Sequence, residues 1–176
     1  MLHATTWKKR QPPGKIARIR SSVHCALFAV LLVTPSRADM GDLLLTLGPE
    51  DGQSDDNFSN AIAVDAGIVV IGADWKNDDT GAAYFMDATT GHPLSTVTAA
   101  DPEPGDHFGY DVAVSGNAAI VGAPFKSDAG LESGAAYVFV RNAGQWTEQA
   151  ILRPSNAASG DWFGGDVDIS GDTIVV

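Results

Sequence analysis

The acidic side chains of residues 74–80 are the strongest candidates for chemistry in this sequence. The segment reads Asp74-Trp75-Lys76-Asn77-Asp78-Asp79-Thr80 and offers several oxygen ligands on one short loop. Oxygen ligands on a flexible loop suit calcium, so one interpretation is a weak cation site made by Asp74, Asn77, Asp78 and Asp79. The interpretation that we favour is a solvated turn, because Asn and Asp are common turn residues.

No set of residues with the spacing of a catalytic site is evident. His92 and His107 are the only histidines after residue 38, and neither has a partner at metal-ligand spacing or a serine in a Gly-x-Ser-x-Gly elbow. The 22 acidic residues offer too many pairs to nominate two for glycoside hydrolysis. Trp75, Trp146 and Trp162 can stack on a sugar or a peptide, but strand edges also use tryptophan for packing. We therefore expect no enzymatic activity.

The chain divides into two segments of opposite charge. All 22 acidic residues lie from Asp39 onward, whereas seven of the eleven Lys and Arg lie before it. A basic stretch, the apolar run Cys25 to Val33 and the small-residue site Ser36-Arg37-Ala38 follow the order of a secretory signal peptide. The apolar run is too short for a membrane-spanning helix of ~20 residues. We predict a signal peptide over 1–38, in preference to an uncleaved anchor or an upstream start codon.

The exported chain that remains is strongly acidic. Its 4 basic and 22 acidic side chains give a formal charge of −18. Nucleic acid and anionic membrane surfaces carry like charge, so neither is an expected partner, and we expect no membrane insertion after cleavage. The one cysteine, Cys25, leaves with the signal peptide, so no disulfide is expected. The sequence predicts a secreted, periplasmic or cell-surface protein.

Three segments of the exported chain repeat one pattern. Each has a phenylalanine at its start, and Phe58, Phe108 and Phe163 follow one another at nearly equal intervals. In the first two repeats a Gly-Ala pair follows the Phe at an identical spacing, and a Gly-Ala-Ala-Tyr sequence comes later. The landmarks of the repeat are Phe58, Gly72, Ala73, Phe108, Gly109, Gly122, Ala123, Pro124, Phe163 and Gly164. Their constant order indicates a repeat architecture.

Each repeat has the hydrophobic pattern of β-strands. Apolar residues alternate with period two, and Gly and Asn types suited to tight hairpins lie at 65–67, 115–117 and 170–172. The expected strands are 58–64, 68–73, 82–87 and 94–99 in the first repeat and 108–114, 118–123, 135–141 and 146–152 in the second. Four strands in about 50 residues are typical of a propeller blade.

We therefore predict an all-β partial β-propeller over 39–176, built of four-stranded antiparallel blades. Blade 1 covers about 57–99, blade 2 about 107–153, and 161–176 begin a third blade. Aspartates that directly precede the Phe landmarks are interpreted as turn residues: Asp55, Asp56, Asp106 and Asp161.

Phe108-Gly109 followed by Gly122-Ala123-Pro124 resembles the FG-GAP repeat of integrin α-subunit heads and of many exported bacterial proteins. The resemblance covers 42–176, about two and a half repeats, although the first repeat has Ser59 for Gly and Asp74 for Pro. It implies that the Phe packs between neighbouring blades and that the Gly lets backbones approach closely.

The resemblance also bears on calcium. Calcium-binding members of the family carry a long Asp-x-Asp-x-Asp-Gly loop between the first and second strands, but here that link is a tight turn such as Ser115-Gly116-Asn117. Six to eight oxygens cannot converge from so short a turn. We expect no required cofactor and no tightly bound calcium in 39–176. The sequon at Asn57 is expected to be unused, because its middle residue is the Phe58 anchor.

The function expected from the resemblance is a non-enzymatic recognition or adhesion scaffold with a protein or carbohydrate ligand. Two alternatives stay open: the noncatalytic propeller of a larger secreted hydrolase, and a calcium-stabilised adhesin whose ion loops lie beyond Val176. Residues 43–47 are expected to form an orphan fourth strand, and the whole an open arc. Open blade edges predict self-association.

Overall fold

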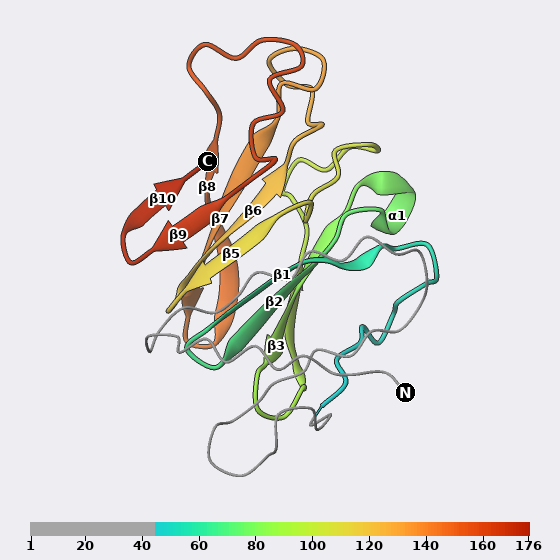
Figure 1. Cartoon of the computed structure of the whole chain (residues 1–176), viewed down its shortest axis with the longest axis vertical. Coiled ribbons are helices and arrows are strands. Elements are labelled where there is room, and N and C mark those ends of the chain that lie inside the picture. The colour runs from blue at the N-terminus through green and yellow to red at the C-terminus, as the bar shows by residue number, and fades with distance from the viewer. Residues whose placement is uncertain (1–44) are drawn as a thin grey trace, which may run out of the picture.

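The computed structural model describes residues 45–176, which form an all-β structure (Figure 1). The predicted signal peptide over 1–38 lies outside the described residues. The elements are β1 (Phe58–Asp65), β2 (Ile68–Ala73), α1 (Lys76–Asp79), β3 (Ala82–Asp87), β4 (Pro93–Val97), β5 (Val112–Ser115), β6 (Ala118–Ala123), β7 (Ala135–Asn142), β8 (Gln145–Leu152), β9 (Asp168–Ser170) and β10 (Thr173–Val175). Within this part of the chain no helix is long and apolar enough to cross a membrane.

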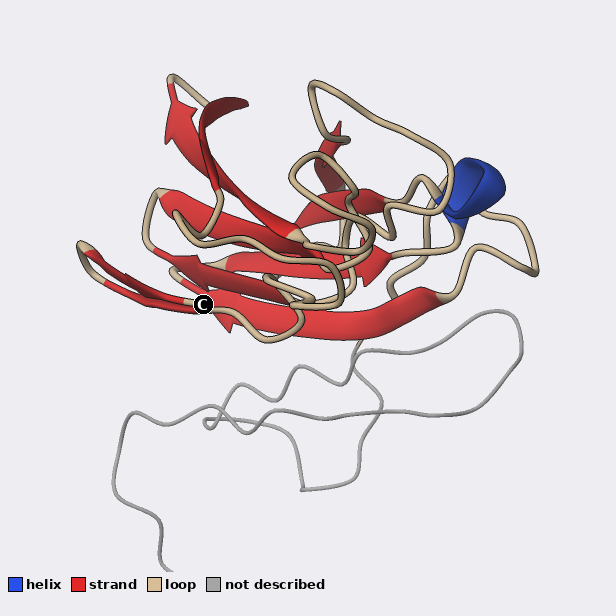
Figure 2. Ribbon diagram, turned by 90° about the horizontal axis from the view of Figure 1, so that it is seen from above, coloured by secondary structure: helices blue, strands red, loops and turns tan. Residues whose placement is uncertain are grey.

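The strands form two four-stranded blades and the start of a third. The order β1-β2-β3-β4 makes blade 1, the order β5-β6-β7-β8 makes blade 2, and β9 pairs with β10. All these pairings are antiparallel, and the sheets lie face to face (Figure 2). The predicted fold class, a partial propeller of antiparallel four-stranded blades, is confirmed.

Both faces of each blade are apolar, which is why the sheets stack. On β2, Ile68 and Val70 face the core cluster shared with blade 2, whereas Val69 and Ile71 belong to the cluster on the opposite face of blade 1. Successive residues of the strand therefore pack into two different apolar interfaces, one on each face of the blade, and neither face is left to solvent. A propeller needs this arrangement because every blade is sandwiched between neighbours.

The second strand of each blade touches the next repeat through glycine backbone. A Cβ placed on Gly72 would lie 2.0 Å from the carbonyl oxygen of Gly109, and one on Gly122 would lie 1.9 Å from that of Gly164. Gly109 and Gly164 have φ values of 95° and 92°, a region that favours glycine. Neighbouring blades are thus joined by direct backbone contact at these two places.

Phe108 lies at the junction of the two complete blades and is fully buried. Its ring packs edge-on against Tyr137 and Phe139 of β7, with centroids 5.2 and 5.9 Å apart. Phe58 and Phe163 hold the same place in the flanking repeats but are only half-buried. The anchoring contact is therefore complete between blades 1 and 2.

Some strand boundaries differ from the sequence prediction. The strand expected at 108–114 is shortened to β5 because Phe108 instead makes an isolated parallel bridge to Gly81 of blade 1. Residues 45–47 of the expected orphan strand 43–47 form no strand, although Leu47 is buried against blade 1. The fourth strand of blade 1 runs over Pro93–Val97, not 94–99.

The short element α1 is a turn with left-handed backbone. Asn77 and Asp78 have φ/ψ of 53°/63° and 58°/46°, and Asp79 has a φ of 61°. Asn and Asp tolerate this region better than other residues with side chains. Its carbonyls point at the next repeat, because Asp79 O accepts from His107 N at 2.8 Å and Thr80 O accepts from Phe108 N at 3.1 Å.

The glycine contact predicts a selective loss of stability. Gly72→Ala should lower the free energy of unfolding by about 1–3 kcal/mol, because its methyl group meets backbone that cannot rotate away. Gly48→Ala is the matched control, since a Cβ there has no atom within 4 Å, and it should change stability by less than about 0.5 kcal/mol. Urea unfolding measures both. Equal effects would show that the backbone contact is not tight.

Candidate functional site

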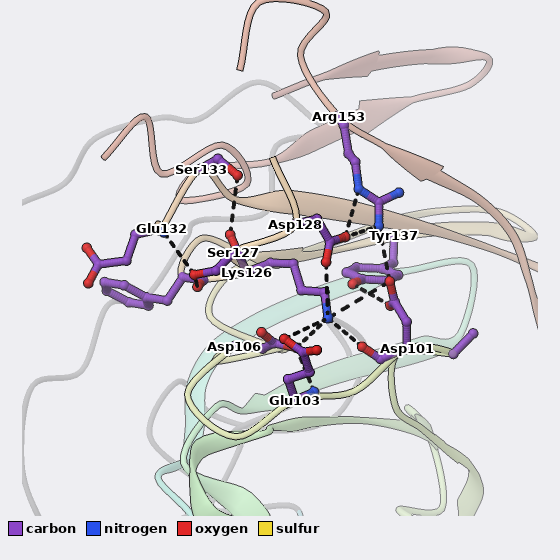
Figure 3. Close-up of polar contacts among 12 residues, drawn as sticks. Asp101, Glu103, Asp106, Lys126, Ser127, Asp128, Glu132, Ser133, Tyr137 and Arg153 are labelled. Atoms are coloured by element: carbon purple, nitrogen blue, oxygen red, sulfur yellow. Dashed lines mark hydrogen bonds and ion pairs between the residues drawn. The ribbon is translucent and has the colours of Figure 1, made fainter. Parts of the chain in front are cut away.

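A buried lysine surrounded by carboxylates lies at one end of blade 2 (Figure 3). The Nζ atom of Lys126 is 3.1 Å from Asp106 Oδ2 and 2.5 Å from the backbone oxygen of Asp101, and the lysine is only 1% exposed. Glu103 and Asp128 place further carboxylate oxygens 3.8 and 3.6 Å from the same nitrogen. We call this group the blade 2 lysine cluster.

Two more side chains close the outer side of the cluster. The Tyr137 hydroxyl donates to Asp101 Oδ1 at 2.8 Å. The Arg153 guanidinium pairs with Asp128 and, at 3.1 Å, with Asp101 Oδ2. Asp101 therefore meets a lysine, a tyrosine and an arginine at once, which joins the chain on both sides of blade 2 to its third strand.

Blade 1 contains the same arrangement. Lys76 Nζ lies 3.1 Å from Asp56 Oδ2 and 3.2 Å from Asp51 Oδ2, and the Tyr84 hydroxyl donates to Asp51 Oδ1 at 3.0 Å. Each of these residues occupies the repeat position of its counterpart in blade 2. The blade 1 lysine cluster is therefore a second copy of one structural device.

The loops that carry the clusters are the β2–β3 and β6–β7 links and the segments that lead into each repeat. In each leading segment an aspartate accepts a backbone hydrogen bond from the residue three positions earlier: Gln53 to Asp56, Glu103 to Asp106 and Ala158 to Asp161. This local turn presents the aspartate before the following strand begins. We call this end of the blades, residues 48–57, 74–81, 98–111, 124–134 and 153–167, the loop end.

Electrostatics keep both lysines charged. Burial alone lowers the pKa of Lys126, but the hydrogen bond and charge of Asp106, with the neighbouring carboxylates, more than offset burial and raise it. The pKa of Lys76 is also raised, because Tyr84, Asp56 and Asp51 outweigh its burial. Charged lysines among carboxylates are suited to holding the loops together through ion pairs.

The predicted cation ligands do not converge on one point. Asp74 is 2% exposed, and its oxygens contact Asn57 Nδ2 at 2.8 Å and His107 Nδ1 at 3.3 Å, which ties repeat 1 to repeat 2. Asn77, Asp78 and Asp79 are exposed on the turn. Across residues 45–176 no group of three or more His, Cys, Asp or Glu is arranged to hold a metal ion.

The sequence interpretation missed the lysine clusters. Asp56 and Asp106 are turn residues, as predicted, but they are also 6% and 3% exposed and pair with the lysines. The signal was present, because Lys76 and Lys126 both follow the phenylalanine of their repeat at an identical spacing and are two of the four basic residues after Asp39. A lysine that recurs in register within an acidic repeat is a candidate for a buried ion pair, because buried lysines are almost always paired.

Aromatic rings gather at the loop end between blade 2 and the third repeat. The ring of Phe125 lies 4.8 Å from His107, 6.0 Å from Tyr110 and 5.6 Å from Trp162, measured between centroids. Tyr110 is 40% exposed and Trp162 is 53% exposed. We call these four residues the aromatic patch. Trp146, in contrast, is a core residue stacked on Phe85 at 4.2 Å.

The lysine cluster makes a direct prediction about stability. Lys126→Met should lower the free energy of unfolding by about 3–5 kcal/mol, because it leaves Asp106 buried without its partner. Arg153→Met is the control: this arginine is partly exposed, so the loss should be less than about 1 kcal/mol. If the single variant does not fold, Lys126→Met with Asp106→Leu should recover most of the loss. Equal losses at Lys126 and Arg153 in urea unfolding would contradict this.

The raised pKa of Tyr84 predicts that the stability of the fold decreases at alkaline pH. Burial raises its pKa from 10.0 to about 12, and the hydrogen bond to Asp51 acts in the same direction, although Lys76 opposes it. The folded state therefore favours the neutral phenol, and the stability from this preference is full below pH 10 and lost as the pH rises through about 12. Phenolate absorbance should show a late step that Tyr84→Phe removes; an unchanged titration curve in the variant would be incompatible with this.

Comparison with known families agrees with the repeat geometry. The model of the FG-GAP repeat matches residues 45–86, 94–139 and 146–176, and each of the first two matches contains one complete pairing of lysine, two aspartates and tyrosine. No curated protein matches the chain significantly. Because the three matches cover most of residues 45–176 and follow the blades, the chain belongs to the FG-GAP repeat family.

Proposed function

We propose that this protein is a non-enzymatic recognition module of the extracellular space or cell envelope, which binds its ligand at the loop end. The proposal depends on one observation: the loops that the lysine clusters hold in place also carry the exposed rings of the aromatic patch. Buried lysine clusters hold the loops in place, and the aromatic patch lies on these same loops with Tyr110 and Trp162 exposed. Preorganised loops bind without a large cost of ordering.

Export is supported by two independent features. The segment 1–38 has the order of a signal peptide, and FG-GAP repeats typically occur in extracellular proteins. An exported chain with a single cysteine cannot staple its loops with internal disulfides, so other interactions must hold them. The lysine clusters and the glycine contacts supply those interactions.

We further propose that the module needs no calcium for binding. A lysine ammonium lies among the carboxylates of each complete blade, so positive charge is supplied by the chain itself. A covalently attached cation cannot be removed by a chelator. The positions of Asp74, Asn77, Asp78 and Asp79 are compatible with this proposal, because Asp74 is already bonded to Asn57 and His107.

Binding arrays test the proposal directly. Full-length protein should bind at least one class among printed neutral, acidic and amino glycans, collagen and fibronectin, both with and without EDTA. Tyr110→Ala should weaken that signal about tenfold, since exposed aromatic residues commonly dominate recognition. Asp172→Asn, at the opposite end of the strands, should leave it unchanged. Binding that is lost in EDTA, or unaffected by Tyr110→Ala, would contradict the proposal.

A further inference from the structure

Trp162 is an unusual residue for its backbone position. It directly precedes the Phe landmark, where the other repeats place Asn57 and His107, and all three have left-handed φ values of 52°, 52° and 54° respectively. Asn and His adopt this region several times more readily than most residues, and a bulky side chain there is an outlier. A strained backbone position supports a hypothesis of function. The side chain of Trp162 is also 53% exposed and so can reach a ligand.

The exposed indole is held in one orientation. Its Nε1 donates to Glu132 Oε2 at 2.9 Å, and its ring lies 5.6 Å from Phe125. The Trp162 ring therefore packs at a tilt against Phe125, and its N–H edge is hydrogen-bonded to the Glu132 carboxylate. A fixed, flat aromatic surface loses little entropy when a ligand stacks on it.

The surroundings of the ring are strongly negative. The loop end carries fifteen Asp and Glu against Lys76, Lys126 and Arg153, a formal charge of −12. These three cations are already surrounded by carboxylates within the lysine clusters. The field at the aromatic patch therefore attracts cations and repels anions.

Backbone groups near the patch are already paired across the repeats. Trp162 N donates to Glu132 O at 3.2 Å, Phe163 N to Ser133 O at 3.1 Å, and Gly160 N to Leu131 O at 2.9 Å. Extended peptides usually bind by pairing with an open strand edge or by filling a groove. The aromatic patch offers ring faces and the carboxylate oxygens of Glu132, which match a sugar with hydroxyl and ammonium groups better than a peptide backbone.

We propose that the aromatic patch binds a glycan of amino sugars with free, protonated amines. This inference rests on the proposed function and names its ligand class. The apolar face of a pyranose ring stacks on Trp162, and the ammonium groups are held by Glu132 and the negative loop end. The ring gives affinity for a sugar, and the charge selects the amine form over the acetylated or acidic forms.

Matched oligosaccharides test the charge and the ring separately. Calorimetry of the full chain at mildly acidic pH should show that a glucosamine hexamer binds at least about tenfold more tightly than its fully N-acetylated form, which keeps the rings and removes the charge. Hexalysine, which keeps the charge and lacks the rings, should also bind about tenfold more weakly.

Two variants separate binding from folding. Trp162→Asn introduces the residue that repeat 1 uses at this position, so the melting temperature should be unchanged or higher while binding falls at least about tenfold. Glu132→Gln keeps an oxygen that can accept the indole N–H but removes the charge, and should weaken binding about threefold. Asp172→Asn should bind as the original chain does.

Equal binding of the glucosamine and N-acetylated hexamers would overturn the inference, as would equal binding of hexalysine. Unchanged affinity in Trp162→Asn, or no binding of the glucosamine hexamer, would also overturn it. Array binding of another ligand class that depends on Tyr110 would leave the proposed function intact while this inference fails.

Discussion

The spacing of the blades is set by contact between backbone atoms at two glycine pairs. No side chain fits at Gly72 or Gly122 on the second strand of a blade, because a Cβ there would lie within 2.0 Å of a carbonyl oxygen in the segment that leads into the next repeat. That distance fixes how deeply Phe108 sits between the sheets and brings the loop-end segments of neighbouring repeats into hydrogen-bonding range.

Once the loops are drawn together, their charge has to be balanced. The segments concerned carry most of the acidic residues after Asp39, and three of their aspartates, Asp56, Asp74 and Asp106, lose most of their contact with water. Asp74 is bonded to Asn57 and His107. Buried carboxylates are stable only when they are paired or hydrogen-bonded. Lys76 and Lys126 supply that pairing for Asp56 and Asp106, which is the structural role of these two basic residues in an acidic chain.

The fold features that could be predicted from the sequence are those that depend on residues within one strand or one repeat. Period-two alternation and the spacing of Phe and Gly gave the all-β class, the blade arrangement and the strands β2, β3 and β6 with their observed bounds. The sequence was less informative where segments from different repeats meet. Phe108 was expected in a strand of blade 2 but makes a bridge to Gly81 of blade 1. Asp74 was expected on a solvated turn but contacts His107 of the next repeat. In both places the contact across the blade interface outweighs the local preference. The aromatic patch brings together side chains that are up to 55 residues apart, His107 and Trp162 among them, so no short sequence motif predicts it.

The ion pairs and the backbone contacts divide the molecule in different ways. Asp51, Asp56, Lys76 and Tyr84 all lie within one stretch of chain, whereas the close contacts of Gly72 and Gly122 join two successive stretches. A gene duplication that copies one stretch therefore copies the lysine, aspartates and tyrosine of its cluster together. Such a unit can be added or removed during evolution without separating either buried lysine from its buried aspartate.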